Sequence, residues 1–363
     1  MKARFIAFYL PQYHPIPENN EWYGAGFTEW TNVVKAKKLF KGHYQPHIPA
    51  DLGFYDLRLK ETRVAQAELA KKYGIEGFCY WHYWFGNGKR LLEMPFNEVV
   101  KDKEIDFPFC LAWANHSWEK KQWDNQQNNQ LIVKQTYNGE KDYLEHFNAL
   151  LLAFKDERYM RVEGKLLFFI YNPSDSPEIV TMMNLWNKLA KENGLNGFYF
   201  VAKTFYNQNK EQLIRDGFDA VYNETMYSIH HNLKLNQKIR LAIQRKVFKK
   251  PTTFPYKEAA KLLITQDDYS DSTIPVIVPN WDHSPRSGSN GFIFTDADPK
   301  YFKKVVKEAL QCVKNKPDDK KLIVIKSWNE WGEGNHMEPD LKYGTGYLEA
   351  VTEAIEEFDN FNR

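Results

Sequence analysis

The sequence predicts a (β/α)8 barrel that takes up the whole chain of 363 residues as a single domain. Three observations favour this fold: eight short hydrophobic runs, helix-like segments between them, and polar or aromatic residues directly after every run. Nearly continuous hydrophobicity over a few residues is typical of parallel strands that are buried on both faces. Eight such strands alternating with helices fit the length of one closed α/β barrel.

The expected strands are rich in β-branched and aromatic residues and lie throughout the chain. In order they are residues 4–10, 75–81, 107–113, 165–171, 197–203, 218–222, 274–279 and 322–328. The alternative is an open, doubly wound sheet. No GxGxxG or GxxxxGK[ST] motif follows the first run, so the usual nucleotide-binding signatures of that alternative are missing.

The expected helices are recognised by their apolar periodicity and by signals at their ends. They cover residues 57–73, 141–154, 177–193, 210–216, 299–316 and 347–358. Gly74 and Gly194 follow two of them as stop signals, and Asp298 precedes Pro299 as an N-cap. The basic, less regular segment 228–269 is expected to be a helical insertion between the sixth and seventh strands, with its charges on a solvated face.

Composition excludes several classes of function. Lys and Arg number 49 against 47 Asp and Glu, and the net charge of +2 argues against a nucleic-acid binder. No run approaches the ~20 apolar residues of a membrane span, and the N-terminus lacks the pattern of a signal peptide. Three scattered cysteines suit a reducing compartment, so we expect a cytoplasmic protein. The sequence gives no ground for inferring an obligate protein partner.

Aromatic residues make up 16% of the chain, and many stand beside Asn, Asp, Glu or His. This mixture suits an oligosaccharide or polysaccharide substrate, because sugar C–H faces stack on rings while the hydroxyl groups need fixed hydrogen-bond partners. The alternative is simply a Trp-rich core. The site of a barrel lies at the carboxyl ends of its strands. These positions supply the expected sugar-binding residues: Tyr9, Trp81, His82, Trp113, Asn115, Tyr171, Glu224, Trp281, Asp282, Trp328, Asn329 and Trp331.

Glu330 and Glu333 stand three residues apart on a Gly-containing turn after the eighth run. Two carboxyl groups in different environments can act as acid and base, and cleavage of a glycosidic bond needs such a pair. We expect both to be catalytic; the alternative is that one of them caps the turn or pairs with an arginine such as Arg286. The ten histidines show no HExxH motif and no zinc-like Cys/His spacing, so neither a metal nor a cofactor is expected.

Three motifs resemble the WbsX-type family, which is often labelled a glycosyltransferase in polysaccharide biosynthesis. They are residues 8–15 (FYLPQYHP), 26–30 (GFTEW) and 328–334 (WNEWGEG). The sequence is also similar to the endo-α-mannosidases of glycoside hydrolase family 99, which are (β/α)8 barrels. The resemblance covers residues 4–339, nearly the whole chain.

The resemblance implies cleavage with retention of configuration through a 1,2-anhydro-sugar intermediate. It makes Glu330 the base that removes the proton of the sugar 2-hydroxyl. It makes Glu333 the acid that protonates the leaving oxygen and then the base for the incoming water. Gly332 departs from the endo-mannosidases, which commonly carry a bulkier His there, and this departure bears on mannose specificity.

Three functions follow from these observations. The first is an endo-acting glycoside hydrolase on a bacterial polysaccharide or mannan-like glycan. The second is a glycosyltransferase or transglycosylase in the synthesis of O-antigen or capsule polysaccharide. The third is a carbohydrate-binding barrel without catalysis, which would not need the pair of glutamates. Sugar-nucleotide transferases usually have doubly wound folds, so the predicted barrel favours the first function.

Overall fold

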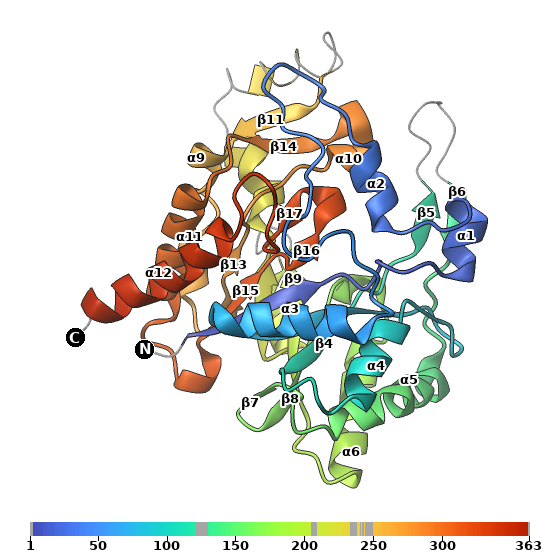
Figure 1. Cartoon of the computed structure of the whole chain (residues 1–363). Helices are drawn as coiled ribbons and strands as arrows, with labels where there is room; N and C mark the ends of the chain where they lie inside the picture. The colour runs from blue at the N-terminus through green and yellow to red at the C-terminus, as the bar shows by residue number, and fades with distance from the viewer. Residues whose placement is uncertain are drawn as a thin grey trace.

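The computed structural model describes residues 3–120, 130–204, 209–232, 238–239, 241, 243 and 250–361. Its centre is a nearly closed barrel of parallel strands with helices around it (Figure 1), so the predicted fold class is confirmed. The strands at the eight predicted places are β1 (Arg4–Tyr9), β2 (Ile75–Trp84), β4 (Phe109–Trp113), β8 (Lys165–Ile170), β9 (Phe198–Thr204), β10 (Ala220–Asn223), β12 (Thr273–Ile274) with β13 (Val276–Ile277), and β15 (Leu322–Ile325).

The seventh strand closes the barrel in two pieces. Its first piece, β12, pairs with β10, and its second piece, β13, pairs with β15, whose other neighbour is β1. Pro275 lies between the two pieces and has no N–H to donate, but its carbonyl accepts a hydrogen bond from the Val324 N–H at 3.0 Å. The seventh strand therefore changes its pairing partner at Pro275, from β10 to β15, and in this way joins the two edges of the sheet.

The interior of the barrel is filled by aromatic rings. Phe8 stacks on Trp81 with ring centroids 4.6 Å apart, and it contacts Phe169 at 5.7 Å and Tyr222 at 5.6 Å. Side chains alternate between the two faces of a strand, so the neighbours of these residues point outward to the helices. The interior around Phe8 is therefore a packed core, and the site of such a barrel is expected beyond its strand ends.

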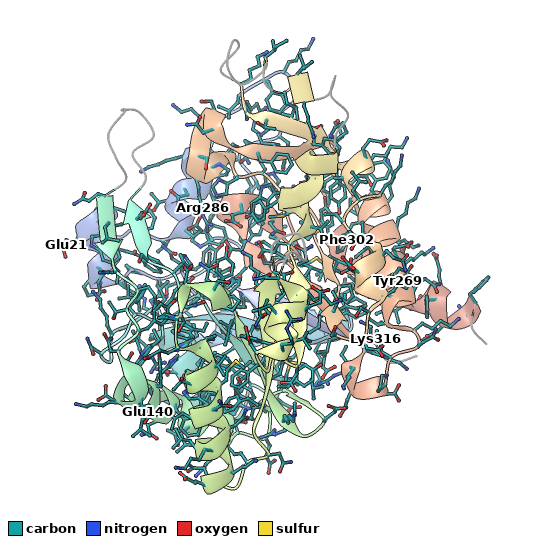
Figure 2. All side chains as sticks on the ribbon, turned by 180° about the vertical axis from the view of Figure 1, so that it is seen from behind. Glu21, Glu140, Tyr269, Arg286, Phe302 and Lys316 are labelled. Carbon is teal, nitrogen blue, oxygen red and sulfur yellow. The ribbon has the colours of Figure 1, made fainter. Side chains whose placement is uncertain are left out.

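Helices at the six predicted places cover the barrel. They are α3 (Lys60–Lys72), α5 (Gly139–Phe154), α6 (Ile179–Glu192), α7 (Lys210–Arg215), α11 (Pro299–Val313) and α12 (Gly346–Phe361). The start of α11 follows its sequence signal, since the Asp298 side chain accepts the Lys300 N–H at 2.9 Å. Phe302 of this helix (labelled in Figure 2) is fully buried, and the centre of its ring lies 5.7 Å from the centre of the Tyr347 ring of α12.

Several short elements were not predicted, and most of them belong to loops. They are α1 (Pro17–Tyr23), α2 (Glu29–Lys35), β3 (Arg90–Leu91), α4 (Met94–Lys101), β5 (Trp118–Lys120), β6 (Gln130–Val133), β7 (Arg161–Val162), α10 (Ser284–Ser287), β14 (Phe292–Thr295), β16 (Asn329–Glu330) and β17 (Asn335–His336). Each is too short to show a clear period of 3.6 or 2 in the sequence. Of these, α1, α2, β5, α10 and β16 contribute residues to the wall of the site described below.

The segment expected to be an insertion follows β10. Its described part contains the 3-10 helix η2 (Thr225–Asn232), β11 (Thr252–Pro255), α9 (Tyr256–Ala259) and the 3-10 helix η3 (Gln266–Tyr269). Here β11 pairs in parallel with β14, outside the barrel. Most of its basic stretch lies outside the described residues. Within the described residues, no helix combines the length and the apolar character needed to cross a membrane.

Candidate active site

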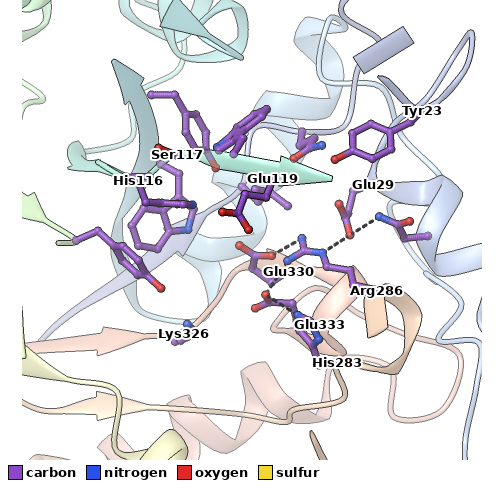
Figure 3. Close-up of a pocket in the computed structure, with 18 of the residues that line it drawn as sticks. Tyr23, Glu29, His116, Ser117, Glu119, His283, Arg286, Lys326, Glu330 and Glu333 are labelled. Carbon is purple, nitrogen blue, oxygen red and sulfur yellow. Dashed lines mark hydrogen bonds and ion pairs between the residues drawn. The ribbon is translucent and has the colours of Figure 1, made fainter. Parts of the chain in front are cut away.

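A cavity of ≈ 520 Å³ opens where the strands of the barrel end. Its walls come from loops and short elements that lie far apart in the chain, including α2, the β5 end, α10 and the turn after β15 (Figure 3). Aromatic rings line part of this surface, namely Tyr23, Phe27, Trp81, Tyr83, Trp118, Tyr171 and Tyr227. Rings beside carboxylates and cations form a surface suited to a polar ligand with apolar faces.

Arg286 of α10 binds three carboxylates at one side of the cavity. Its Nε donates to Glu29 Oε1 at 2.7 Å, one terminal nitrogen to Glu330 Oε2 at 2.9 Å, and the other to Glu333 Oε1 at 2.6 Å (Figure 3). The planar guanidinium can satisfy several acceptors at once in fixed directions. From the sequence, the alternative to catalysis is that one glutamate pairs with an arginine such as Arg286. In the structure both glutamates pair with Arg286, and all three residues line the cavity.

The two glutamates have a shared electrostatic environment. Burial raises the pKa of Glu330 to about 8, and the nearby charge of Glu333 raises it as well, while Arg286 opposes the rise. With this pKa, Glu330 keeps its proton near neutral pH when no substrate is bound, so the cavity holds a potential acid.

Asn329 fixes the turn that presents both glutamates. Its Oδ1 accepts the Leu10 N–H at 2.7 Å and its Nδ2 donates to the Leu10 carbonyl at 3.0 Å, so the loop after β15 is tied to the end of β1. The Tyr13 hydroxyl also donates to the Asn329 carbonyl. Gly334 then takes a left-handed conformation, with φ 56°, between β16 and β17. Hydrogen bonds from Leu10 and Tyr13 thus hold the turn that carries the two glutamates.

A buried group of charges stands on another side of the cavity. Glu224 lies between two lysines, with Lys326 Nζ at 2.8 Å and Lys203 Nζ at 3.3 Å from its oxygens. Burial alone would raise the pKa of Glu224, but the two lysines hold it below its ordinary value. Lys326 lines the cavity, and Lys203 Nζ lies 3.4 Å from the centre of the Tyr171 ring.

Four of the residues expected at the site line this cavity: Trp81, Tyr171, Glu330 and Glu333. They come from β2, the end of β8 and the turn after β15. The structure therefore brings both expected catalytic carboxylates to one surface, together with two of the expected sugar-stacking rings.

Three expected sugar-binding residues point away from the cavity instead. The Tyr9 hydroxyl donates to Gln66 of α3 at 2.6 Å, His82 lies 2.8 Å from His146 of α5 through their Nε2 atoms, and the Trp113 indole donates to the Trp84 carbonyl at 3.0 Å. The reason is strand alternation, which turns Phe8 and Trp81 inward and the next residue outward. These three side chains join the barrel to its helices.

The other expected residues also lie outside the lining of the cavity and are held by protein groups. Asn115 binds the backbone of Asn172 through both of its amide atoms, at 2.7 Å each. Trp331 stacks on His336, with ring centroids 3.6 Å apart. The remaining members of this set are buried and contact the charge group, the strand-eight turn or a second cavity: Glu224, Trp281, Asp282, Trp328 and Asn329. In the structure these residues shape and support the site.

Sequence reasoning missed the groups that most change the chemistry of the cavity. Glu29 lies in the motif at residues 26–30, and the sequence suggests Arg286 only as a partner for one glutamate. In the structure Arg286 binds Glu29 together with both glutamates. His283 Nε2 lies 3.7 Å from Glu333 Oε1, and Lys326 adds a cation. No local pattern marks these positions, because α2 and α10 are joined to the strand-eight turn only by folding.

Comparisons with known proteins agree with this architecture. The family model described as "Glycosyltransferase WbsX" matches residues 5–351. Two curated relatives, both named "Uncharacterized protein WxcX" and both from Xanthomonas campestris pv. campestris, strains B100 and ATCC 33913, are 35% and 34% identical over 359 residues. These alignments cover 98% of this chain and 50% of each relative, so the chain spans about half the length of the curated relatives it matches.

Solved structures show the same fold at low identity. A "Glycoside hydrolase-like protein" superposes with a TM-score of 0.62 at 15% identity, covering 97% of this chain and 94% of the other. The GH99 endo-α-mannosidase of Bacteroides thetaiotaomicron superposes with a TM-score of 0.58 at 17% identity, covering 99% and 98%. At this identity the likeness shows a common barrel fold and leaves the reaction to be argued from the site.

Proposed function

The chain belongs to the glycosyltransferase WbsX family, and we propose that it is a carbohydrate-active enzyme that cleaves glycosidic bonds within a polysaccharide or oligosaccharide with retention of configuration. One observation carries this proposal. Glu330 and Glu333 lie on a single turn, both line the cavity, and Arg286 binds them together. A barrel that only bound sugar would gain nothing from holding two carboxyl groups side by side, since the repulsion between their charges costs stability.

The proposed reaction uses the substrate's own hydroxyl group as the nucleophile. Glu330 removes the proton of the 2-hydroxyl, the 2-oxygen forms a bond to the anomeric carbon, and the bond from that carbon to the leaving oxygen breaks. Glu333 gives its proton to the leaving oxygen. Two inversions at the anomeric carbon then give overall retention, without a bond between sugar and enzyme.

The second step reverses the proton movements. Glu333, now ionised, takes a proton from water, and the water oxygen attacks the anomeric carbon while its bond to the 2-oxygen breaks. The 2-oxygen recovers its proton from Glu330. The cycle therefore ends with the pair in its starting state, and a second sugar hydroxyl in place of water would give transglycosylation by the same steps.

The single proton held by the glutamate pair supports this chemistry. A pair that is doubly ionised at neutral pH would lack an acid, and a doubly protonated pair would lack a base. Burial and the charge of Glu333 keep the pKa of Glu330 near 8, so one proton stays in the empty site. The proposed roles require this proton to reside on Glu333 when substrate is bound, with Glu330 ionised toward the 2-hydroxyl.

Transfer is the second candidate function. The description of the family favours it, since that description names a glycosyltransferase. The same pair of carboxylates supports transfer from an oligosaccharide donor, because only the acceptor hydroxyl group differs. We propose hydrolysis as the first function and transglycosylation as the second, with a polysaccharide as the substrate in both. The rings of Trp81 and Tyr171 are the proposed stacking surfaces for its sugar units.

Two substrates and one variant test this mechanism. A substrate with a 2-deoxy sugar at the cleaved position is expected to be inert, because it lacks the attacking oxygen; normal turnover of it contradicts the mechanism. The Glu333→Gln variant is expected to retain cleavage of substrates with good leaving groups and to lose it with poor ones, since only the latter need an acid. Equal losses with both substrates contradict the assigned acid.

A further inference from the structure

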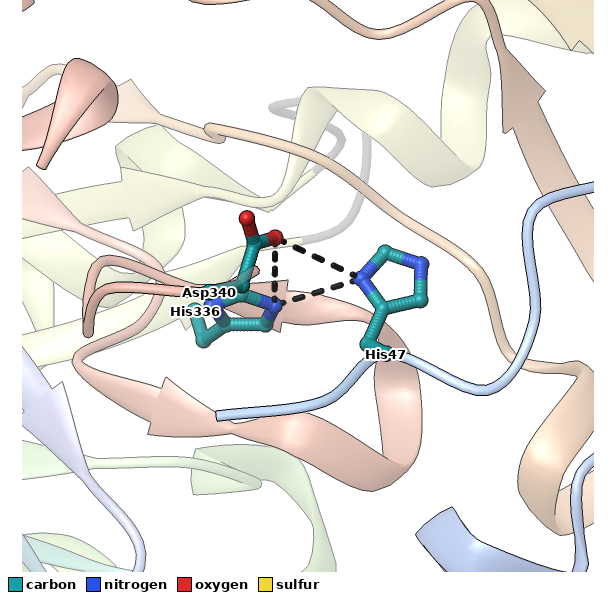
Figure 4. A group of neighbouring side chains, drawn as sticks. All are labelled: His47, His336 and Asp340. Carbon is teal, nitrogen blue, oxygen red and sulfur yellow. Dashed lines mark hydrogen bonds and ion pairs between the residues drawn. The ribbon is translucent and has the colours of Figure 1, made fainter. Parts of the chain in front are cut away.

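A second cavity of ≈ 220 Å³ lies beside the first, between the segment 40–47 and the loops that follow the seventh and eighth strands. His47, His336 and Asp340 meet at its wall (Figure 4). Among the described residues, this is the group in which three potential metal-ligand atoms lie within 4.8 Å of one another. All three side chains are buried, and they come from two segments that lie almost 300 residues apart.

The three atoms form a triangle of suitable size for a metal ion. His47 Nδ1 lies 3.3 Å from His336 Nε2 and 3.9 Å from Asp340 Oδ2, and His336 Nε2 lies 3.8 Å from the same oxygen. Donor atoms about 2.0–2.1 Å from a tetrahedral Zn²⁺ stand about 3.3–3.5 Å from each other. Only a small movement of Asp340 would bring all three to that separation.

The ligand atoms are already oriented by other groups. His336 Nδ1 must carry a proton, because it donates at 2.9 Å to the Glu338 carbonyl, which can only accept. In the neutral ring this leaves a lone pair on Nε2, directed into the triangle. Asp340 Oδ1 accepts the backbone N–H groups of Lys342 at 2.9 Å and Tyr343 at 2.6 Å, so its carboxylate is fixed with Oδ2 toward the histidines.

Backbone pairing brings the two segments together independently of any ion. The Ala50 N–H donates to the Pro339 carbonyl at 2.9 Å, and the Leu341 N–H donates to the Ile48 carbonyl at 2.9 Å. The site is therefore built by the fold, with hydrogen-bonded outer partners of the kind that orient metal ligands. The alternative without an ion is a plain hydrogen bond from His47 Nδ1 to His336 Nε2.

We propose that His47, His336 and Asp340 bind one divalent transition-metal ion, of which Zn²⁺ is the representative, with a water molecule from the cavity as a further ligand. Two imidazoles and a carboxylate are donors that such ions accept. On binding, the single proton of the neutral His47 ring moves from Nδ1 to Nε2, and the metal takes the Nδ1 lone pair. The ion clamps the segment around His47 to the segment that follows the two glutamates. This inference is independent of the proposed reaction.

Metal binding is tested directly on protein treated with a chelator and then freed of it. Calorimetric titration with Zn²⁺ is expected to show one site per chain, and Zn²⁺ is expected to raise the thermal midpoint. Co²⁺ is expected to give visible absorption bands typical of nitrogen and oxygen ligands at low coordination number. A wild-type protein that binds no Zn²⁺ and shows no such bands overturns the proposal.

Variants locate the ion. His47→Ala and Asp340→Asn are each expected to weaken Zn²⁺ binding by more than about 100-fold, because even the outer partners of metal ligands contribute about 10–100-fold. Lys342→Met is the matched control: Lys342 lines the same cavity, with its Nζ 4.8 Å from the Tyr44 ring, but it supplies a positive charge and no ligand. It is expected to retain one ion per chain. Unchanged binding in both ligand variants overturns the assignment.

Discussion

The carboxylate of Glu29 occupies the space that a side chain at Gly332 would fill. A Cβ built on Gly332 would overlap Glu29 Oε1, and would lie 2.7 Å from Glu29 Cδ and 3.0 Å from Arg286 Nε. The absence of a side chain at Gly332 therefore allows Glu29 and Arg286 to pack against the turn that bears both proposed catalytic glutamates.

The first prediction concerns this contact. Gly332→Ala is expected to lower kcat/KM at least about tenfold and to destabilise the fold by about 1–3 kcal/mol, as overpacked sites do. Glycan cleavage assays and thermal unfolding measure the two effects. The double variant Gly332→Ala/Glu29→Ala removes the overlapping carboxylate and is expected to recover stability. Full stability and activity in the single variant would contradict the close packing.

The second prediction concerns the pH dependence of activity. Activity is expected to fall above about pH 8, because Glu330, with a pKa of about 8, then loses the proton that the reaction needs from an acid. Arg286 lowers the pKa of Glu330, so Arg286→Met is expected to move this loss of activity to higher pH. Profiles of kcat/KM against pH for both proteins provide the measurement. An unchanged or lower position of the alkaline limb in Arg286→Met contradicts the assignment.

The third prediction concerns the glutamates themselves. Glu330→Gln is expected to lower kcat by about 10²–10⁴-fold while glycan binding persists, since general acid–base groups contribute about this much. Glu21→Gln, an exposed position on α1 (Figure 2), is the control for a lost carboxylate and is expected to keep full activity. Steady-state kinetics and calorimetric titration of glycan separate turnover from binding. Wild-type kcat in Glu330→Gln would remove it from the mechanism.

The fourth prediction concerns stability at acidic pH. Burial lowers the pKa of His14 from 6.5 to about 4, so between these values the unfolded chain binds a proton that the folded chain does not. His14 therefore causes stability to fall as the pH drops from about 6.5 to about 4, by up to about 3 kcal/mol. Denaturant unfolding of wild type and His14→Gln at several pH values measures this. The difference in their unfolding free energies should change across that window, and a constant difference would contradict the assignment.

The sequence predicted the barrel because buried parallel strands carry an unusually clear signal. It also placed Trp81, Tyr171 and the two glutamates at the strand ends, where they line the cavity. Tyr9 shows where such reasoning stops: it sits at the right end of β1, but strand alternation turns Phe8 inward and directs Tyr9 to Gln66. The position of a residue along its strand predicted that it lies near the cavity, but it did not predict whether its side chain faces the cavity.

Contacts between distant loops could not be predicted in the same way. Glu29 and Arg286 are 257 residues apart in the chain, and neither α2 nor α10 has a periodic pattern that points to the other. The triangle of His47, His336 and Asp340 has no short-range spacing either, although it is compact in space. Both groups depend on how loops close over the barrel, which is decided by tertiary packing rather than by local preference.

The central claim is that the glutamate pair cleaves glycosidic bonds without an activated sugar donor. The most direct test is mass spectrometry of α-mannans and bacterial surface oligosaccharides after incubation with wild type or Glu330→Gln, with no sugar nucleotide present. The account predicts shortened glycans, or glycans rejoined at new lengths, with wild type only. Extension of a glycan solely when a sugar nucleotide is added, with no cleavage in its absence, would contradict it.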